Sequence, residues 1–253
     1  MIRGRMERKV VVITGGATGI GEAAVGLFAN EGAYVVIADT QQHADKGAEI
    51  ADKIRFSGGE AKFVRADVSR PGEIESMILK TVAAYGKLDY AFNAATVSGA
   101  YPIIETTLEQ WDQIMDTNLR GVWLCMKYQI QAMMKNKNGG VIVNLASVGG
   151  LMGLALTGAF AASKGGVISL TRTAAIECAS YNIRVNSISP DAVSSDIFAA
   201  LPDDLKIKIA NSYPLQRASS PLEIAKAVLY LCSDDAASIT GHNLVMDGGY
   251  SGH

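Results

Sequence analysis

Apolar residues follow two different periods along this chain, and the two periods alternate. Residues 10–13 are four consecutive β-branched residues followed by glycines, which is typical of a short strand buried on both faces of a sheet. From Ile20 to Phe28 the apolar residues recur at helical spacing. The chain therefore opens with a strand, a glycine-rich turn and an amphipathic helix.

The same alternation continues to the end of the chain, with no linker and no internal repeat. Further strands are predicted at 33–38, 61–66, 88–93, 141–145, 183–188 and 243–246. Helices are predicted at 41–56, 71–85, 108–115, 121–135, 158–180 and 221–232. We expect a single doubly wound (Rossmann-type) α/β domain over residues 1–253, with about seven parallel strands and helices on both faces.

In an open parallel sheet, ligands bind in a crevice at the carboxyl ends of the strands. The residues predicted at those ends are Thr14, Asp39, Asp67, Asn93, Ser147 and Pro190. Residues 192–219 are polar and follow neither period. We expect this section to form a mobile substrate flap.

The first turn carries three glycines, Gly15, Gly19 and Gly21. Without side chains, these positions let a phosphate approach bare backbone N–H groups at the positive N-terminus of a helix. The alternative is a tight turn that holds no ligand. The strand before the turn and the amphipathic helix after it favour the phosphate site.

Asp39 ends the second predicted strand, 24 residues after Gly15. An acidic residue at that point of a βαβ unit accepts hydrogen bonds from the adenosine ribose, although it could instead cap the next helix, and both roles are compatible. Its carboxylate would also repel a 2′-phosphate, and the next residue is Thr40 rather than a cation. The sequence therefore favours NAD over NADP. Asp67, which ends the third strand, faces the same choice between the crevice and a helix cap.

Composition narrows the class of protein. Hydrophobic residues make up 49% of the 253 residues and the net charge is −2, so a large core is expected and no surface for nucleic acid or membrane. No apolar run approaches the ~18 residues of a membrane span, and no signal peptide is predicted. The three cysteines and three histidines show neither disulfide nor ligand spacing. We expect a cytoplasmic protein without a metal site.

These motifs together resemble the short-chain dehydrogenases/reductases over nearly the whole chain. The turn at residues 14–21 matches the family's TGxxxGxG, Asp67-Val68 matches its adenine-contacting pair, and residues 246–249 match its tail. The resemblance places Asn118, Ser147 and Lys164 in the family's catalytic tetrad. It also implies a homotetramer, associated through the helices at 121–135 and 158–180.

From the motifs and the resemblance we expect NAD to be held by one set of residues along the crevice. These are Gly15, Thr18, Gly19, Ile20, Gly21, Asp39, Asp67, Val68, Asn93, Ala94, Lys164, Pro190, Asp191, Val193 and Ser195. In this family a serine and a tyrosine hold the substrate oxygen, and the tyrosine is the acid or base. A lysine one helical turn later lowers the tyrosine pKa and binds the nicotinamide ribose. An asparagine supports a water that connects to the lysine.

Phe160 stands where the family has that tyrosine, thirteen residues after Ser147 and four before Lys164. A phenyl ring has no proton to exchange, and losing a general acid or base costs about 10²–10⁴-fold in rate. Residues 93–96 read NAAT where the family usually has NNAG, Asp191 replaces a glycine, and Ser195 replaces a threonine. The large departures all lie at the nicotinamide end. We therefore expect a protein that binds the dinucleotide but whose hydride chemistry is impaired or altered.

Three explanations remain open for these departures. An engineered inactivating change would explain Phe160 but not Asp191 or Thr96. A natural divergent member could carry out altered or non-redox chemistry, and a cofactor-sensing pseudoenzyme would need no turnover. Tyr101, Tyr213 or Asp191 could also replace the missing phenol.

The residues expected to line the substrate pocket are mostly apolar. They are Val97, Tyr101, Val148, Leu154, Phe160, Val193, Phe198 and Tyr213. Such a lining favours a small, largely apolar alcohol or ketone, a class that includes cyclic compounds.

Overall fold

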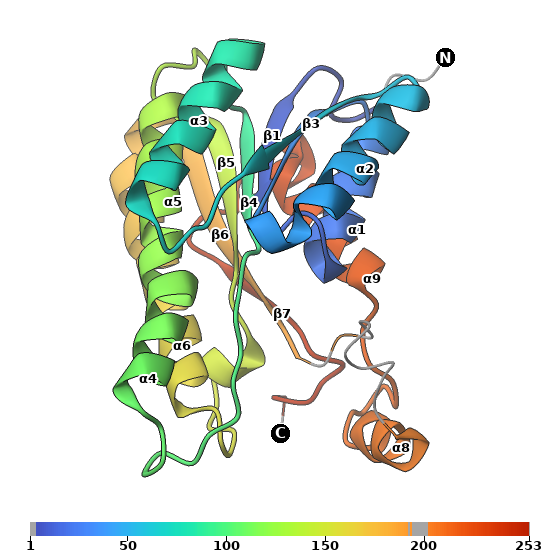
Figure 1. The fold of residues 1–253 in the computed structure, drawn as a ribbon, viewed down its shortest axis with the longest axis vertical. Helices are drawn as coiled ribbons and strands as arrows, with labels where there is room; N and C mark the ends of the chain where they lie inside the picture. Colours follow the sequence, from blue (N-terminus) through green and yellow to red (C-terminus); the bar gives the residue numbers. More distant parts are fainter. Residues whose placement is uncertain (1–3, 192, 194–201, 253) are drawn as a thin grey trace.

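The computed structural model describes residues 4–191, 193 and 202–252 (Figure 1). Its strands form one parallel sheet in the order β3-β2-β1-β4-β5-β6-β7. The strands are β1 Val10–Thr14, β2 Tyr34–Asp39, β3 Glu60–Arg65, β4 Tyr90–Asn93, β5 Gly140–Leu145, β6 Ile183–Pro190 and β7 Asn243–Met246. The strand order reverses between β1 and β4, which is where a doubly wound sheet opens its ligand crevice. The predicted Rossmann-type fold is confirmed.

Helices cover both faces of the sheet (Figure 1). One face carries α1 Gly19–Asn30, α2 Ala44–Phe56 and α9 Pro221–Cys232, and the other carries α3 Pro71–Tyr85, α5 Gly121–Met133 and α6 Gly158–Cys178. Two further helices, α4 Leu108–Met115 and α8 Asp203–Asn211, lie on the side of the carboxyl ends. None of the described helices combines the length and the apolar character needed to cross a membrane.

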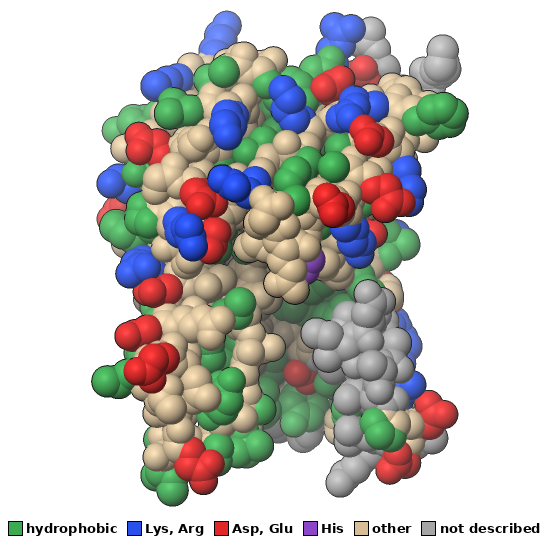
Figure 2. All heavy atoms as spheres, in the orientation of Figure 1, with side chains coloured by type: hydrophobic (Ala, Val, Ile, Leu, Met, Phe, Trp, Pro, Cys, Tyr) green, Lys and Arg blue, Asp and Glu red, His purple; other side chains and the backbone are tan. Residues whose placement is uncertain are grey.

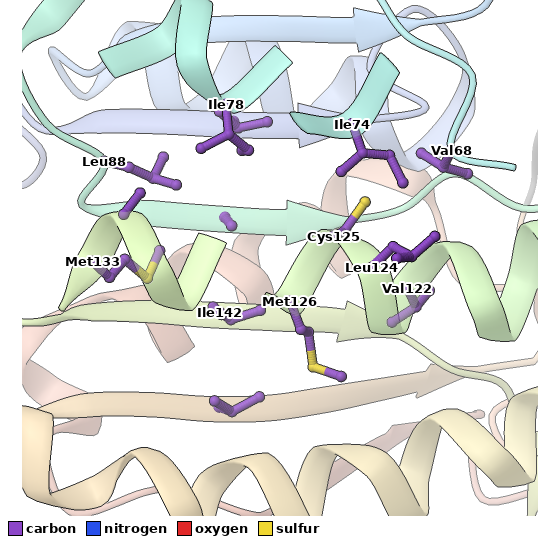
Figure 3. Close-up of a cluster of buried hydrophobic side chains, with 14 of the residues drawn as sticks. Val68, Ile74, Ile78, Leu88, Val122, Leu124, Cys125, Met126, Met133 and Ile142 are labelled. Atoms are coloured by element: carbon purple, nitrogen blue, oxygen red, sulfur yellow. The ribbon is translucent and has the colours of Figure 1, made fainter. Parts of the chain in front are cut away.

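The core is divided into two clusters because successive residues of a strand face opposite sides of the sheet. In β1, Val12 packs in the cluster under α3, α5 and α6, whereas Val11 and Ile13 pack in the cluster under α1 and α9. Figure 3 shows the first cluster, in which Ile74 of α3 and Cys125 of α5 point toward one another. Burial on both faces explains why residues 10–13 of β1 and 35–38 of β2 are unbroken apolar runs.

Most predicted helix and strand ends agree with the structure to within two residues. The predicted helix at 41–56 begins with a separate 3₁₀ turn, Gln41–His43, before α2. The helices predicted at 108–115 and 121–135 are joined by a π-helical turn, Asp116–Arg120, which makes room for the buried Asn118.

Helix α8 forms within the section at 192–219, for which a flap was predicted and no helix was assigned. Pro202 occupies the N-cap position of α8, and Asp203 and Asp204 lie in its first turn, where carboxylates stabilise the helix dipole. These local signals fall within a polar sequence without strong helical periodicity. Most of the section before α8 lies outside the described residues.

Candidate functional site

A cleft of about 620 Å³ opens at the carboxyl ends of the central strands. Figure 2 shows this face of the molecule hollowed between the side that carries α4 and the side that carries α8. The glycine turn, the ends of β2 and β3, the loop after β4 and the π-helical turn all contribute to its lining. The predicted cofactor residues among those that line it are Gly15, Thr18, Gly19, Ile20, Gly21, Asp39, Asp67, Val68, Ala94 and Val193.

At two positions of the glycine turn, the backbone of another residue lies so close that only glycine fits. Gly15 has φ +65°, and a Cβ on it would lie 2.9 Å from the Cα of Ala95. A Cβ on Gly21 would lie 2.0 Å from the carbonyl oxygen of Gly15. Helix α1 follows, and its N-cap residue, Thr18, makes no side-chain capping bond. The first-turn N–H groups are therefore available to an anion such as a pyrophosphate.

Asp39 ties the end of β2 to this turn. Its Oδ2 accepts a hydrogen bond from the N–H of Ala17 at 3.0 Å, and its Oδ1 accepts one from the N–H of Thr40 at 2.8 Å. Its side chain is only 6% exposed. The N-cap of the following 3₁₀ turn is Thr40, so the alternative role of Asp39 as a cap is not observed.

His43 is a cleft residue that the sequence did not identify. Its Nδ1 lies 2.9 Å from Oδ1 of Asp39. The i, i+4 spacing was visible in the sequence, but the 3₁₀ turn that brings the imidazole back over the strand end was not predicted. The site thus contains a carboxylate–imidazole pair beside the glycine turn.

Asp67 and Val68 line the cleft just after the end of β3, the strand next to β2. Its Oδ1 accepts hydrogen bonds from the N–H of Ser69 at 2.9 Å and from Ser69 Oγ at 2.7 Å. The N-cap of α3 is Arg70, so capping by Asp67, the alternative considered from sequence, is not observed either.

Asn93, the last residue of β4, lies in a network of buried polar side chains. Its Nδ2 donates to Oδ1 of Asn144 at 2.8 Å and to Oε1 of Gln129 at 3.0 Å, and Gln129 donates back to Asn93 Oδ1 at 2.7 Å. Asn144 also donates to Oγ1 of Thr171 at 3.0 Å. Only the polar residues at core positions of α5, α6 and β5 indicate this network in the sequence. Ala94, the residue after Asn93, lines the cleft directly.

Asn118 holds the loop that follows β4. Its Oδ1 accepts from the N–H of Val97 at 2.8 Å and from Oγ1 of Thr96 at 3.1 Å, and its Nδ2 donates to the Val97 carbonyl at 2.8 Å. Asn118 is fully buried in the π-helical turn. Thr96, a departure from the family pattern, is therefore a direct hydrogen-bond partner of a tetrad position.

Lys164 and Phe160 lie on one face of α6, as their spacing predicts. The Lys164 ammonium donates to the carbonyl of Leu145 at 2.8 Å and lies 5.6 Å from the centre of the Phe160 ring. Burial lowers the pKa of Lys164 to about 7, because its side chain is only 1% exposed. Leu145 itself lines the cleft, so the lysine is held at the edge of the same cavity.

Ser147 lies beside the phenyl ring. Its Oγ accepts a hydrogen bond from the N–H of Gly149 at 3.1 Å. A Cβ built on Gly149 would lie 3.6 Å from Ser147 Oγ, 3.8 Å from Cδ1 of Phe160 and 3.6 Å from Cδ1 of Leu154. The serine, the phenyl ring and one apolar residue of the expected pocket therefore border one small space.

Asp191 and Tyr213 were predicted separately as candidates to replace the missing phenol. In the structure they form a hydrogen-bonded pair. The Tyr213 hydroxyl donates to Asp191 Oδ2 at 2.7 Å, and the Tyr213 ring packs 5.4 Å from that of Tyr250. The pair joins the residues after α8 to the end of β6 at Pro190. Neither member is among the described residues that line the cleft.

The remaining predicted residues are placed as follows. Tyr101 pairs with the loop before α6, donating its N–H to the carbonyl of Leu156 at 2.8 Å, and it does not line the cleft. Val97 lines the cleft and Val148 is buried. Ser195 and Phe198 lie outside the described residues. No cluster of three or more His, Cys, Asp or Glu side chains suited to a metal ion occurs within the described parts of the chain.

Comparison with known proteins adds an independent line of evidence. Residues 15–251 match a family described as enoyl-(acyl carrier protein) reductase. The chain is 38% identical over 247 residues to the 2,5-dichloro-2,5-cyclohexadiene-1,4-diol dehydrogenase of Sphingobium indicum, covering 96% of this chain and 97% of that protein. It is 38% identical over 254 residues to the A-factor type gamma-butyrolactone 1′-reductase of Streptomyces virginiae, covering 98% of both. It is 36% identical over 244 residues to the cis-4-hydroxycyclohexanecarboxylate dehydrogenase of Sinomonas cyclohexanicum, covering 96% of both.

Proposed function

Because the chain belongs to the short-chain dehydrogenase/reductase family, we propose that it is an NAD(H)-dependent oxidoreductase with altered catalysis at Phe160. Its substrate is a small, largely apolar, cyclic alcohol or ketone. One observation carries the proposal: Leu145, whose carbonyl holds Lys164, lines the same cleft as the glycine turn and Asp39. A dinucleotide bound along that cleft would extend from the turn to the catalytic positions.

The residues at the adenosine end suit NAD. The first turn of α1 offers N–H donors to the pyrophosphate, and the buried Asp39 offers a carboxylate to the ribose hydroxyls. The same negative charge disfavours the 2′-phosphate of NADP. The bound nicotinamide supplies the hydride acceptor or donor, and this chain supplies the binding groups and the proton-holding groups.

The catalytic end retains three of the four family positions. Ser147 places a hydroxyl beside the ring of Phe160, where it can donate a hydrogen bond to a substrate oxygen. Phe160 can neither donate nor accept a proton. Lys164 is the titratable group in contact with that ring, and its pKa of about 7 lets it hold or release a proton near neutral pH. We assign the proton-holding role to Lys164, with Asn118 fixing the loop that faces it.

The substrate class is inferred from two sources. Leu154 and the Phe160 ring give the region near Ser147 an apolar character, and Val97 is an apolar residue of the cleft lining. Two relatives are named for the oxidation of ring alcohols, a dichlorocyclohexadienediol and a hydroxycyclohexanecarboxylate. A cyclic alcohol of similar size fits both observations.

A second candidate function is a non-redox enzyme or a cofactor-sensing pseudoenzyme on the same fold, and Phe160 is the observation that favours it. Titration calorimetry with NADH, together with a panel of cyclic alcohols and ketones assayed in both directions, separates the two. Binding with turnover supports the oxidoreductase, and binding without turnover supports the second candidate. Absence of binding by either nicotinamide cofactor overturns both.

We also propose a cytoplasmic homotetramer. The outer sides of α5 and α6 carry an open groove lined by Leu119, Trp123, Gly166 and Leu170, and Trp123 is 47% exposed. An apolar groove of this kind is typical of a surface that a second copy covers. Light scattering on the purified protein gives the mass directly, and a monomer at micromolar concentration would overturn the proposal.

A further inference from the structure

His43 occupies a position from which it can act on cofactor choice. Its imidazole and the Asp39 carboxylate both line the cleft, and they share one contact, Nδ1 to Oδ1 at 2.9 Å. The histidine side chain is 36% exposed, whereas that of Asp39 is 6% exposed. The imidazole is therefore the solvent-facing member of the pair that would meet the ribose of the cofactor.

We propose that His43 makes the discrimination between NAD and NADP depend on pH, relaxing it when the imidazole is protonated. The inference rests on the proposed function, because it requires a nicotinamide dinucleotide in the cleft. It concerns selectivity at the ribose and does not involve the catalytic positions.

The chemistry follows from the two protonation states of the ring. A neutral imidazole can donate at Nδ1 to Asp39 but leaves the full negative charge of the carboxylate facing the 2′ position. An imidazolium offsets that charge, and its Nε2–H is then a charged donor for a phosphate oxygen. It also holds Asp39 Oδ1 more tightly, in competition with the ribose hydroxyls of NAD. Acidification should therefore weaken NAD binding and strengthen NADP binding.

The other charged groups around this pair are held in ion pairs or hydrogen bonds. Lys46 of α2 pairs with Glu22 of α1 at 2.8 Å, and Asp67, just after the end of β3, pairs with Arg70 at 3.5 Å. Arg65 of β3 donates to Gln41, at the start of the turn that carries His43. The cleft is also lined by Asp116, which pairs with Arg120. Histidine is the residue type whose charge ordinarily changes between about pH 5 and 8, whereas carboxyl, lysine and arginine groups ordinarily do not.

The test compares the dissociation constants of NADH and NADPH at about pH 8.0 and about pH 5.5, which bracket the ordinary histidine pKa of about 6.5. The 2′-phosphate has its own pKa near 6, so some pH dependence is expected without any histidine. The variant His43→Gln keeps a polar side chain and cannot become cationic. The matched control is His242→Gln, because His242 is exposed in the loop before β7 and does not line the cleft.

The measured quantity is the NADPH dissociation constant divided by the NADH dissociation constant. We expect acidification to lower this ratio about tenfold more in the wild-type and His242→Gln proteins than in His43→Gln. A tenfold difference is about the size of one charge-assisted contact. His43→Arg, which carries a permanent cation, should have a lower NADPH-to-NADH ratio of dissociation constants than the wild type at about pH 8.0, and this ratio should change on acidification only as it does in His43→Gln. An equal fall in wild type and His43→Gln would assign the whole effect to the phosphate and overturn the inference, while leaving NAD binding and the proposed function intact. Failure of both cofactors to bind would overturn the proposed function itself.

Discussion

The ammonium of Lys164 lies 5.6 Å from the centre of the Phe160 ring and donates to the carbonyl of Leu145, a residue that lines the cleft. The resemblance to the family places a phenol at the position of this ring. The phenyl group keeps the shape of the site and an attractive contact with the cation, but it removes the exchangeable proton. The lysine is therefore held by a carbonyl and an aromatic face rather than by a titrating partner.

Lys164→Met should weaken NADH binding about tenfold or more, because a charge-assisted contact to the ribose is worth roughly 1.5–3 kcal/mol. Titration calorimetry at neutral pH measures this directly. Lys80→Met, at an exposed position of α3, is the matched control and should bind as the wild type does. An unchanged dissociation constant in Lys164→Met would mean that the ammonium does not reach the cofactor.

Lys164 should also make the stability of the protein depend on pH. Burial lowers its pKa in the folded state to about 7 from 10.5, so between these values the unfolded chain binds a proton that the folded protein has released. Stability therefore rises with pH through this window, by at most about 1.4 kcal/mol per pH unit from this group.

Urea unfolding at about pH 7 and about pH 9 checks this prediction. The wild type should gain stability relative to Lys164→Met as the pH rises. The pKa of each buried thiol, Cys125 and Cys232, is raised to about 12 by burial, and these groups are common to both proteins, so the difference removes their contribution. Parallel pH dependences in the two proteins would contradict a strongly lowered lysine pKa.

The regular part of the fold could be predicted from sequence because its pattern is dictated by burial. Residues 10–13 of β1 are all apolar since both faces of the strand are covered, and α3 and α9 begin at prolines and end where predicted. The π-helical turn at Asp116–Arg120 and the helix α8 could not be predicted in the same way. The first depends on burying Asn118 against the loop after β4, and the second has charged and apolar residues in no clear period.

The candidate site was predicted as far as it consists of residues at fixed spacing. The glycine turn, Asp39 and the Lys164–Phe160 pair belong to this group. His43 beside Asp39, the Asn93–Gln129–Asn144 network and the Tyr213–Asp191 pair come from tertiary contacts. These contacts join residues that are distant in the sequence, or residues that an irregular turn brings together. No periodic pattern in the sequence therefore predicts them.

Asp39 should be the main determinant against NADP. Asp39→Asn removes the charge and keeps one oxygen acceptor, which can serve the N–H of Ala17 or that of Thr40 but not both. NADH and NADPH should then bind with affinities closer to each other. Asp39→Ala should narrow the gap as well. It should also lower the melting temperature, because it leaves the buried Ala17 N–H unpaired at a cost of about 1–3 kcal/mol. Equal discrimination in wild type and Asp39→Asn would show that the charge does not select the cofactor.

The Asp191–Tyr213 pair should stabilise the structure rather than carry catalysis. Tyr213→Phe removes the hydroxyl that donates to Asp191 at 2.7 Å and leaves the ring against Tyr250. We expect a loss of about 1–2 kcal/mol in the free energy of unfolding. Turnover by any active form of the protein should fall less than about threefold, compared with the 10²–10⁴-fold expected for an acid or base. A larger loss with unchanged stability would instead make this pair the replacement for the missing phenol.

Phe160→Tyr should supply the missing acid or base. The new phenol would sit one helical turn before Lys164 and beside Ser147, and the nearby cation should lower its pKa. Oxidation of a cyclic alcohol with NAD should rise by about two orders of magnitude or more. Little stability should be lost, because one hydroxyl is added to a half-buried ring. The control Phe56→Tyr makes the same exchange at an exposed residue at the end of α2 and should leave the rate unchanged.

The outcome of that exchange also separates the explanations for the altered site. If Phe160→Tyr folds and binds NADH but stays inactive on a broad alcohol panel, the defect is not confined to the phenol. Thr96 bonds to Asn118 and Asp191 bonds to Tyr213, so both departures are built into contacts of the surrounding structure. Thr96→Gly and Asp191→Gly should then be added singly and together to Phe160→Tyr. Activity that appears only in the combined variant would indicate a site rebuilt for another purpose, whereas activity in Phe160→Tyr alone would indicate a dehydrogenase that lacks a single hydroxyl.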